Sequence, residues 1–443
     1  MASTYLSKTL GTSTNTYKGT VSVWLKRSGL SSDQVIYGNY TSGTQRGKLV
    51  IAGDGKLMYY QNDGGTNTIK LETNRLFRDV GAWYHIVLSV DTTQGTASDR
   101  VKLYVNGTQE TSFATATYPS QNLIFYLNAN SVLNYIGQEG NSSDYWDGSM
   151  THFHFIDGTA YAPTSFGEVD STSGIWKAKS SASVTYGNNG FFLKFENSGA
   201  MGTDSSGNSN TFTVNGTLTQ NVDTPDNNFC TLTPLIRMAI TLNNGNTQVT
   251  DTDSSWYGVG STMGVSSGKW YWEYKLTRIG NYAQDGVMGG LPGNGYNDIY
   301  NTYVGSKTAG VALNTGEGKI YSADSSTTWF GSANSQGQII GVALDLDNNK
   351  IYYSQNGVFG NSSNPATNTN GYALSATIIA NKPLLPCSSI NNCTIDYNFG
   401  NGFFGTTAVA SSNADAAGYG LMEYAVPTGF YTLNTKNLNT YGG

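Results

Sequence analysis

The sequence predicts an all-β protein made of two antiparallel β-sandwiches and a short C-terminal tail. Hydrophobic residues recur at every second position along much of the chain, which is the period of strands, and helical periodicity is scarce. The 30 Tyr, 17 Phe and 8 Trp are residues that pleated, half-buried surfaces favour. Charged residues make up only 12% of the chain, about half the usual share, which excludes coiled coils and long helical bundles.

The clearest strands of the first half are two neighbouring segments. Residues 85–91 place three aliphatic side chains on one face, and residues 101–105 alternate in the same way. The dipeptide Asn106-Gly107 follows directly. Because Asn-Gly accommodates two successive positive φ angles, it is the strongest short-range signal of a β-hairpin.

The same pattern returns in the second half. Residues 339–347 alternate, residues 350–355 follow after a tight turn, and Asn356-Gly357 ends the second segment. Two distant copies of one supersecondary unit predict two sandwiches of similar build and not one continuous sheet.

Turn-forming residues mark the boundary between the two halves. Asp204–Asn210 and Asp223–Asn228 are dense in Asp, Asn, Ser, Gly and Pro. We expect the tail to pack on its own sandwich or to dock on a neighbour. The predicted divisions are a first sandwich over residues 1–222, a linker over 223–236, a second sandwich over 237–405 and a tail over 406–443.

Charge and cysteine content exclude several classes of function. The net charge of −6 and the lack of a Lys/Arg run argue against binding of nucleic acid or anionic membranes. No apolar stretch approaches the roughly 20 residues of a membrane span, and the first ten residues lack a secretory signal. Three cysteines cannot build a disulfide framework. Cys387 and Cys393 are close enough in sequence to pair, but we expect reduced thiols in a protein made in a cytoplasm.

An ordered series of motifs in the first half resembles the laminin-G-like, concanavalin-A-like jelly-roll family, over roughly residues 1–200. This resemblance implies a jelly-roll sandwich, and it raises the question of a calcium ion at the sandwich rim, which members of that class often hold. The motifs, in order, are Trp83–Val90, Val101–Gly107, Ile136–Gln138 with Trp146–Met150, and Phe153–Asp157.

A second series is similar to the SPRY (B30.2-like) sandwich and covers about residues 240–400. The resemblance implies a second, compact sandwich of antiparallel strands. The motifs are Gly268–Tyr274, Gly286–Gly289, Gly310–Leu313 and Gly341–Asp347 with Ile351–Gly357.

The arrangement of the chain resembles virion structural proteins of tailed, often marine, bacteriophages. The resemblance rests on the order of the two domains, the join Asp223–Pro234 and the ending Val426–Leu438. Such proteins are described as tail fibres or capsid-surface appendages, so it implies a virion-surface location after assembly in the host cytoplasm. Because Val21–Leu25 already has the pattern of a strand, little room is left for an N-terminal docking segment, which favours a distal tip or a capsid decoration.

We predict that the protein is not an enzyme. Glycoside hydrolysis needs two carboxylates about 5–10 Å apart, and no E-x-D motif occurs in a strand. Asp345 and Asp347 share a face, but they end a strand before a turn and are interpreted as turn formers. Ser322–Trp329 resembles a single sialidase Asp-box with Ser326 in the place of glycine, which is a turn device.

No cofactor or metal site is predicted, although two segments carry possible ligands. Asp204–Asn210 offers oxygen ligands for Ca²⁺ but lacks the order and terminal Glu of an EF-hand loop, so an Asx-rich turn is the alternative. His152 and His154 fall on one face of a strand and are suited to chelate a metal. No third ligand is signalled, and solvent-facing alternation opposite Phe153 and Phe155 is the favoured interpretation.

Loops that combine aromatic side chains with Asn and Asp are the best candidates for contacts with glycans or partners, because sugars stack on rings and hydrogen-bond to amides and carboxylates. Trp146 has a structural alternative, since the family packs an aromatic there. The stretch in the second half is expected in a long loop between strands and suits a ligand or another subunit. The residues are Asn141, Asp144, Tyr145 and Trp146 in the first half and Asn281, Tyr282, Tyr296, Asn297, Asp298, Tyr300 and Tyr303 in the second.

These observations lead to one main hypothesis and two alternatives. The main hypothesis is a non-enzymatic virion surface protein that binds host-surface polysaccharide, contacts other virion proteins and forms a homo-oligomer, so that many weak sites add up to avidity. The first alternative is a purely structural capsid decoration or tail component. The second is a glycan depolymerase, which needs a close carboxylate pair in an open groove.

Overall fold

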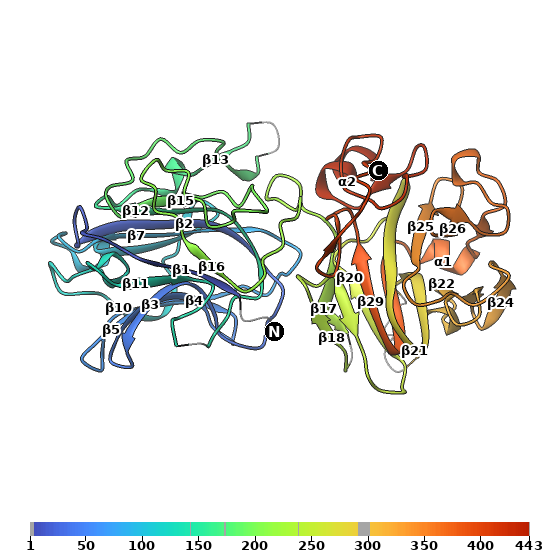
Figure 1. The fold of residues 1–443 in the computed structure, drawn as a ribbon, viewed down its shortest axis with the longest axis horizontal. Helices are drawn as coiled ribbons and strands as arrows, with labels where there is room; N and C mark the ends of the chain where they lie inside the picture. The colour runs from blue at the N-terminus through green and yellow to red at the C-terminus, as the bar shows by residue number, and fades with distance from the viewer. Residues whose placement is uncertain (1–3, 142, 172–173, 238, 291–301, 443) are drawn as a thin grey trace. The chain divides into compact units, whose positions relative to one another are not determined.

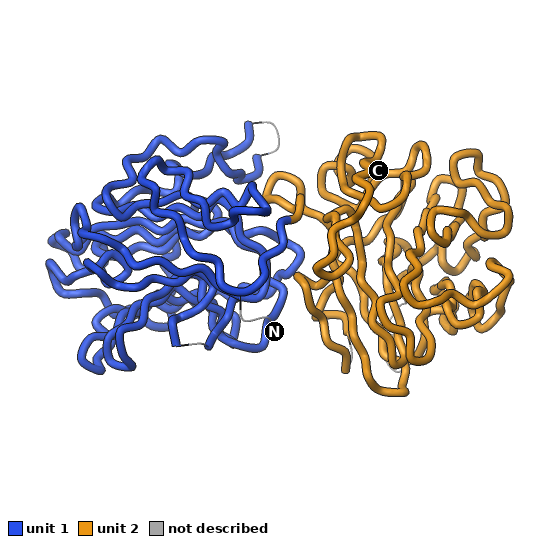
Figure 2. Tube along the Cα trace, viewed as in Figure 1, with its two compact units in different colours: residues 1–220 blue, residues 221–443 orange. Residues whose placement is uncertain are grey.

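The protein is described by a computed structural model in which the chain forms two compact units, residues 1–220 and residues 221–443 (Figure 2). Both units are built from antiparallel β-sheets, which confirms the predicted fold class. No helix in the described part of the chain has the length and apolar character needed to cross a membrane. The described residues are 4–141, 143–171, 174–237, 239–290 and 302–442.

Unit 1 contains two main sheets, A and B, which form the two layers visible in Figure 1. Apolar side chains of both sheets meet in one core. Sheet A has eight strands, in the spatial order β10 (Phe113–Thr117), β6 (Thr66–Leu76), β5 (Lys56–Asp63), β4 (Gln45–Ile51), β3 (Gln34–Ser42), β11 (Leu133–Ile136), β1 (Tyr5–Thr9) and β16 (Thr213–Asn215). Sheet B has six, in the order β15 (Phe191–Leu193), β12 (Gly148–Asp157), β2 (Lys18–Arg27), β7 (Tyr84–Asp91), β8 (Val101–Val105) and β9 (Thr108–Gln109).

The strands predicted over residues 85–91 and 101–105 are β7 and β8, which pair antiparallel. The aliphatic side chains of both strands lie in the core of unit 1. Asn106 and Gly107 form the turn to β9 with φ angles of 48° and 81°, as the Asn-Gly signal predicts.

The outer face of sheet B is covered by residues 158–190, which we call the cover segment. It contains the short elements η3 (Pro163–Ser165), β13 (Gly167–Val169) and β14 (Trp176–Ala178). A second apolar cluster joins side chains of sheet B to those of this segment. Sheet B is therefore packed against the core on one side and against the cover segment on the other, whereas the outer face of sheet A carries polar and aromatic side chains.

Unit 2 is a sandwich in which two long strands, β21 (Lys269–Gly289) and β29 (Leu384–Asn398), pair with each other along most of their length. The first part of β21 pairs with β25 (Ile339–Asp345) and the last part pairs with β22 (Gly310–Asn314). Register shifts in the middle of β21 separate the two parts. Both strands thereby belong to both layers of the sandwich.

The remaining elements of unit 2 are short. The predicted strand over residues 350–355 is β26 (Lys350–Gln355), which pairs with β25. The other strands are β17 (Leu232–Arg237), β18 (Thr241–Asn243), β19 (Gln248–Thr250), β20 (Tyr257–Ser261), β23 (Lys319–Ser322), β24 (Ser325–Thr328), β27 (Val358–Phe359), β28 (Tyr372–Ala373), β30 (Phe403–Phe404), β31 (Thr407–Ala408) and β32 (Tyr431–Thr432). The helices are α1 (Ala376–Ala380) and α2 (Thr435–Tyr441), with short 3₁₀ turns η1 (Ala97–Asp99), η2 (Tyr126–Asn128), η5 (Val304–Ser306) and η6 (Pro365–Thr367) in the chain.

The segments assigned from sequence to a linker and a tail contribute to the core of unit 2. Cys230 and Leu232, inside the expected linker, are buried in that core, and β17 pairs with β20. Phe430 and Leu433, inside the expected tail, are buried in the same core, and β32 pairs in parallel with β21. Apolar side chains between the turn formers account for this, because they fill space that the central strands alone leave open.

Candidate functional site

The outer face of sheet A is the best candidate for a binding surface in unit 1. Leu49 in β4 and Tyr59 in β5 point into the core, so their neighbours Lys48 and Tyr60 point outward. Lys48 pairs in register with Tyr60 on one side and with Gly38 on the other. This register places a cation, an aromatic ring and a glycine next to one another on the same face.

A buried ion-pair network lies on this face. Glu139 receives Arg46 at 2.8 Å and Lys48 at 3.1 Å, and its carboxylate also accepts a hydrogen bond from the Tyr60 hydroxyl at 3.2 Å. Lys48 makes a second ion pair, with Asp144 at 3.0 Å. Only 1% of the Glu139 side chain is exposed, whereas Arg46 and Asp144 each keep 28%. The network thus has a buried centre and a solvent-accessible rim.

Electrostatics keep this network charged. Burial opposes the charge of Lys48, but Tyr60, Glu139 and Asp144 together outweigh burial and raise the pKa of its ammonium group. Burial raises the pKa of the Tyr60 hydroxyl to about 12, so it stays protonated and remains a donor. The Arg46 guanidinium and the Lys48 ammonium also lie over the Tyr60 ring, each 5.4 Å from its centroid.

Residues 137–148 bring the rim to the sheet. Backbone hydrogen bonds tie this loop to strand ends, from the Val35 amide to the Asp144 carbonyl at 2.9 Å and from the Gly137 amide to the Ile36 carbonyl at 3.2 Å. Gly140 has a φ of 106°, and a Cβ there would lie 2.5 Å from the Tyr135 ring. Glycine is therefore required for the loop to cross so close to the aromatic face.

Aromatic rings continue the surface next to the loop. Tyr5 lies 5.9 Å from Tyr135 and 6.2 Å from Tyr145 between ring centroids. All three rings are half-buried, so each keeps part of its face accessible. Rings beside a charged amide-rich rim are the combination that binds sugars, by stacking and by hydrogen bonds to hydroxyl groups.

The four residues predicted in this loop have different roles. Asn141 is exposed, with its amide 3.5 Å from Glu139, and Asp144 belongs to the ion-pair network. Tyr145 is part of the aromatic group. Trp146 instead packs against the core of unit 1, which supports the structural alternative for this residue. The sequence analysis missed Arg46, Lys48, Tyr60 and Glu139, because strand residues that point outward give no signal of which distant loop covers them.

The residues predicted in unit 2 are not in one loop. Asn281 and Tyr282 lie inside β21, at the register shift between Ile279 and Tyr282, so their expected place in a long loop is wrong. A bulge, not a loop, exposes them: 47% of Tyr282 is accessible, and its ring lies against Gly316. Asn281 donates to Asn391 at 2.6 Å.

Tyr303 lies outside that bulge. Its hydroxyl donates to Asp324 at 2.7 Å, and its ring is 5.4 Å from the ring of Trp256. The predicted contacts Tyr296, Asn297, Asp298 and Tyr300 lie outside the described residues.

The possible metal ligands have other partners. Both carboxylate oxygens of Asp204 accept hydrogen bonds from the segment 192–210, including the amides of Phe192 at 2.9 Å and Asn210 at 2.7 Å. Asp204 is therefore the centre of a turn, and these contacts do not fit a calcium site. No cluster of three or more His, Cys, Asp or Glu suited to a metal occurs among the described residues.

His154 corrects the expectation of solvent-facing histidines. It is 3% exposed, its ring stacks on Phe192 at 3.9 Å, and its Nδ1 lies 2.8 Å from the Tyr186 hydroxyl of the cover segment. The cover segment occupies the face that the alternation assigned to solvent. Cys230, Cys387 and Cys393 are all buried and free of disulfide bonds.

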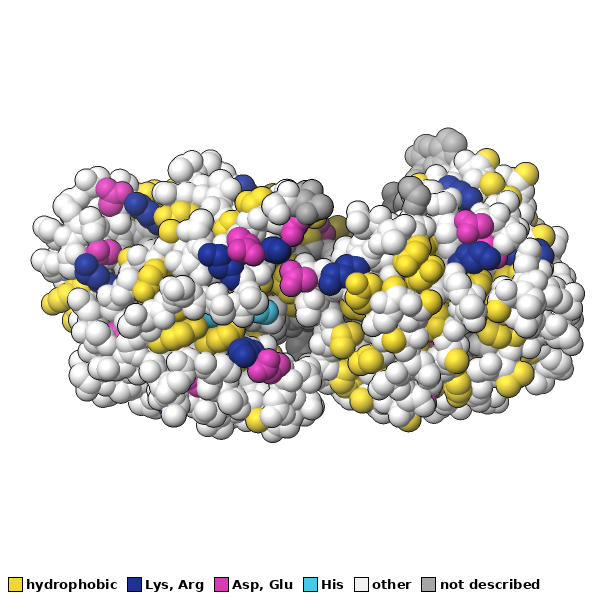
Figure 3. All heavy atoms as spheres, turned by 90° about the horizontal axis from the view of Figure 1, so that it is seen from above, with side chains coloured by type: hydrophobic (Ala, Val, Ile, Leu, Met, Phe, Trp, Pro, Cys, Tyr) yellow, Lys and Arg dark blue, Asp and Glu magenta, His cyan; other side chains and the backbone are white. Residues whose placement is uncertain are grey.

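The surface in Figure 3 is largely uncharged, with acidic and basic side chains lying close together in small groups. Apolar side chains are spread in separate small patches on this face. Such a surface offers hydrogen-bonding groups without a strong field of one sign, which suits neutral, polar ligands.

Comparison with known proteins identifies the two domains. Residues 2–162 match the model of the Concanavalin A-like lectin/glucanases superfamily, and residues 269–402 match the SPRY domain. No curated protein matches the chain. The chain is therefore a two-domain, all-β protein in which a laminin-G/concanavalin-A-like domain precedes a SPRY domain, as the two motif series predict.

Solved structures resemble single domains of the chain. The SPRY domain of human HERC1 is 16% identical, with a TM-score of 0.30, and the match covers 38% of this chain and 96% of that chain. Domain 4 of AbnA, a GH43 extracellular arabinanase from Geobacillus stearothermophilus in complex with arabinotriose, is 18% identical, covering 33% and 64%, with a TM-score of 0.26. A heptameric SAP-like pentraxin from Limulus polyphemus is 18% identical, covering 36% and 71%, with a TM-score of 0.27.

Proposed function

We propose that the protein is a non-enzymatic bacteriophage virion surface protein, a tail fibre or capsid appendage, whose first domain binds host-surface glycans. The observation that carries glycan binding is the rim of Arg46, Asn141, Asp144 and Tyr145 held in place by the buried Glu139 carboxylate. A rim fixed by a buried charge is ordered before the ligand arrives, which reduces the entropy lost on binding. The name of the matched superfamily, which includes lectins, also supports this proposal.

The virion location rests on the resemblance of the domain order and of two sequence segments to phage structural proteins. Each copy of the rim is small and open, so a single contact is expected to be weak. Display of many copies on one particle, together with a homo-oligomeric state and contacts to other virion proteins, would convert weak sites into strong attachment.

The lack of catalysis is part of the proposal. Glu139 and Asp144 share the Lys48 ammonium group, so this face does hold two neighbouring carboxylates. A glycosidase needs one of its two carboxyl groups protonated as a general acid. Here both groups are ion-paired, and neither is a free acid. We expect no release of reducing ends from capsular polysaccharide or lipopolysaccharide of marine bacteria, and measurable release would support the depolymerase alternative.

The binding test uses the full chain, fluorescently labelled, and the same polysaccharide preparations immobilised. We expect at least one preparation to retain the protein, and the double variant Asn141→Ala/Tyr145→Ala to lose at least tenfold of that retention. Thr117→Ala is the matched control, because it is exposed on the edge strand β10 of the same sheet and distant in register from Lys48. Full retention of the double variant would overturn the proposed site.

A purely structural role is the second candidate, favoured by the exposed Tyr282 in the SPRY domain. Exposed aromatic side chains are enriched in protein interfaces. If no polysaccharide retains the wild-type chain, and Tyr282→Ala prevents its assembly into particles, the protein is a decoration or tail component without glycan binding.

A further inference from the structure

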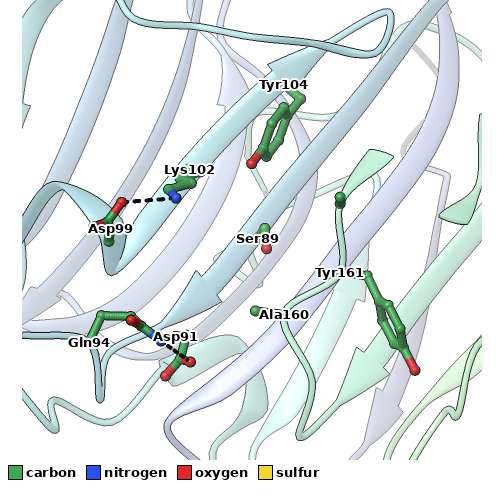
Figure 4. Close-up of a pocket in the computed structure, with 9 residues that line it drawn as sticks. Ser89, Asp91, Gln94, Asp99, Lys102, Tyr104, Ala160 and Tyr161 are labelled. Carbon is green, nitrogen blue, oxygen red and sulfur yellow. Dashed lines mark hydrogen bonds and ion pairs between the residues drawn. The ribbon is translucent and has the colours of Figure 1, made fainter. Parts of the chain in front are cut away.

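A cavity of about 420 Å³ lies in unit 1 on the outer face of sheet B, away from the rim on sheet A. It forms where the cover segment begins and leaves parts of β7 and β8 uncovered (Figure 4). Its volume falls in the lower part of the range of small-molecule sites, roughly 300–1,000 Å³. It is lined by Ser89, Asp91, Gln94, Asp99, Lys102, Tyr104 and residues 160–162.

The charges around this cavity are already paired. Asp91 contacts Lys18 at 3.1 Å and accepts a hydrogen bond from Gln94 at 2.7 Å. Asp99 contacts Lys102 at 2.9 Å, as the dashed line in Figure 4 shows. Each cation thus has a carboxylate partner, and the cavity has no excess charge with which to hold a phosphate or another anion.

The groups left for a ligand are neutral hydroxyls and aromatic surface. Ser89 and Tyr104 project from the adjacent strands β7 and β8, on the same outward face (Figure 4). In the described part of the chain, neither hydroxyl has a hydrogen-bond partner. Both residues are half-buried, so their hydroxyls lie at the wall of the cavity and not in bulk solvent.

The geometry points to a second saccharide site in this cavity, for a neutral sugar. Sugar hydroxyls can both donate and accept, so they match Ser89, Tyr104 and the outer oxygens of the two ion pairs, while the Tyr104 ring offers a face for stacking. Two sites on one domain, on different sheets, would allow one copy to hold two segments of a glycan. This inference rests on the proposed function only for the class of ligand.

The test follows saturation-transfer NMR of galactose, lactose and maltose with the full chain. We expect a signal for at least one of them, and at least a fivefold loss in Ala160→Trp, which fills the cavity from its wall. Ser98→Trp is the matched control, because it adds the same bulk to an exposed residue of the neighbouring turn that does not line the cavity. The double variant Ser89→Ala/Tyr104→Phe, which removes only two hydroxyls, is also expected to lose signal.

Galacturonic acid provides the test of charge, since it has the shape of galactose with an added carboxylate. We expect it to bind at least fivefold more weakly than galactose. Equal or tighter binding of the acid, an unchanged signal in Ala160→Trp, or no signal from any of the three sugars would each overturn the inference.

The two saccharide sites fail separately. If Asn141→Ala/Tyr145→Ala abolishes both polysaccharide retention and the sugar signal while Ala160→Trp keeps them, the rim is the site and the cavity is not. If the sugar signal depends on Ala160 but the double variant keeps full polysaccharide retention, the cavity binds sugar and the proposed rim is wrong.

Discussion

The two units bury ionisable side chains of opposite kinds. Unit 1 buries imidazoles at the contact between sheet B and the cover segment. His85 is fully buried, its ring stacks on Trp24 at 4.8 Å, and its Nδ1 accepts a hydrogen bond from Trp176 Nε1 at 3.0 Å. Because an indole nitrogen can only donate, the neutral imidazole carries its proton on Nε2 and donates it to Ser22, 2.9 Å away.

Unit 2 buries carboxyl groups within its sandwich. Glu273 in β21 is fully buried and accepts hydrogen bonds from the amides of Glu423 at 2.8 Å and Tyr424 at 2.9 Å, and from the Tyr271 hydroxyl at 3.1 Å. Asp285, further along β21, accepts a hydrogen bond from the Tyr397 hydroxyl. Glu273 thereby attaches the C-terminal segment to the central strand.

The difference shows how two sandwiches of one fold class attach an extra segment to a sheet. Desolvation lowers the pKa of His85 to about 3, so the cover segment is held by a neutral base. Desolvation raises the pKa of both Glu273 and Asp285 to about 7, so the C-terminal segment is held by an acid that burial drives towards its neutral form. The two attachments should therefore respond to protons in opposite ways.

The largest expected effect tests the attachment in unit 2. Glu273→Ala removes an acceptor from three buried donors, each of which costs about 1–3 kcal/mol when left unsatisfied. We expect a loss of about 3 kcal/mol or more in the unfolding free energy of unit 2, measured by urea denaturation. Hydrogen exchange should show faster exchange at residues 421–433, because Glu273 no longer holds them.

Two further variants define this result. Glu273→Gln keeps an acceptor and should cost less than the alanine variant, while Glu317→Ala, at a half-exposed carboxylate of the same unit, should change the free energy by about 0.5 kcal/mol at most. A loss below about 1 kcal/mol in Glu273→Ala would show that the C-terminal segment is held by its apolar side chains alone.

The second prediction concerns pH. The unfolded chain binds more protons than unit 1 between the folded pKa of His85, about 3, and the usual value of 6.5, so unit 1 loses stability as pH falls through this window. Folded unit 2 binds more protons than its unfolded chain between about 4.5 and 7, so it loses stability as pH rises. One group changes the free energy by up to about 1.4 kcal/mol per pH unit. Hydrogen exchange resolved by unit, corrected for intrinsic rates, measures both slopes.

The groups that face these side chains set the control. His152 is the charged neighbour that also disfavours protonation of His85 and His154, and it acts in the same direction as burial. His85→Gln removes the titrating ring and should flatten the acid slope of unit 1 without changing unit 2. Parallel slopes in the two wild-type units would contradict the comparison.

Local pattern was enough to predict the hairpins and the class of each domain. The pairing of β25 with β26 follows from alternation and Asn356-Gly357, because a hairpin brings together residues that are neighbours in sequence. The motif series predicted both domain types for the same reason, since each motif is a short, continuous segment.

The candidate site was predicted only in part. Asn141 and Asp144 are signalled by loop composition, but their partners Lys48 and Arg46 are more than ninety positions away, and only the register of sheet A brings them together. Likewise, the alternation around His154 identifies an outward face but not the cover segment that buries it. Tyr282 was assigned to a loop because a bulge inside a long strand interrupts alternation in the same way as a turn does.

The smallest expected effect separates two aromatic residues that the sequence put in one class. Trp146 packs against the core of unit 1, so Trp146→Ala should lower its unfolding free energy by about 2 kcal/mol, less than the 3–5 kcal/mol of a fully buried ring. Tyr282 is 47% exposed, and Tyr282→Ala should cost below about 1 kcal/mol in unit 2. Urea midpoints of the two variants measure both. Because Tyr282→Ala leaves the fold nearly unchanged, any contact it loses is a direct one, whereas a loss in Trp146→Ala reports a displaced loop; equal costs in the two variants would remove that distinction.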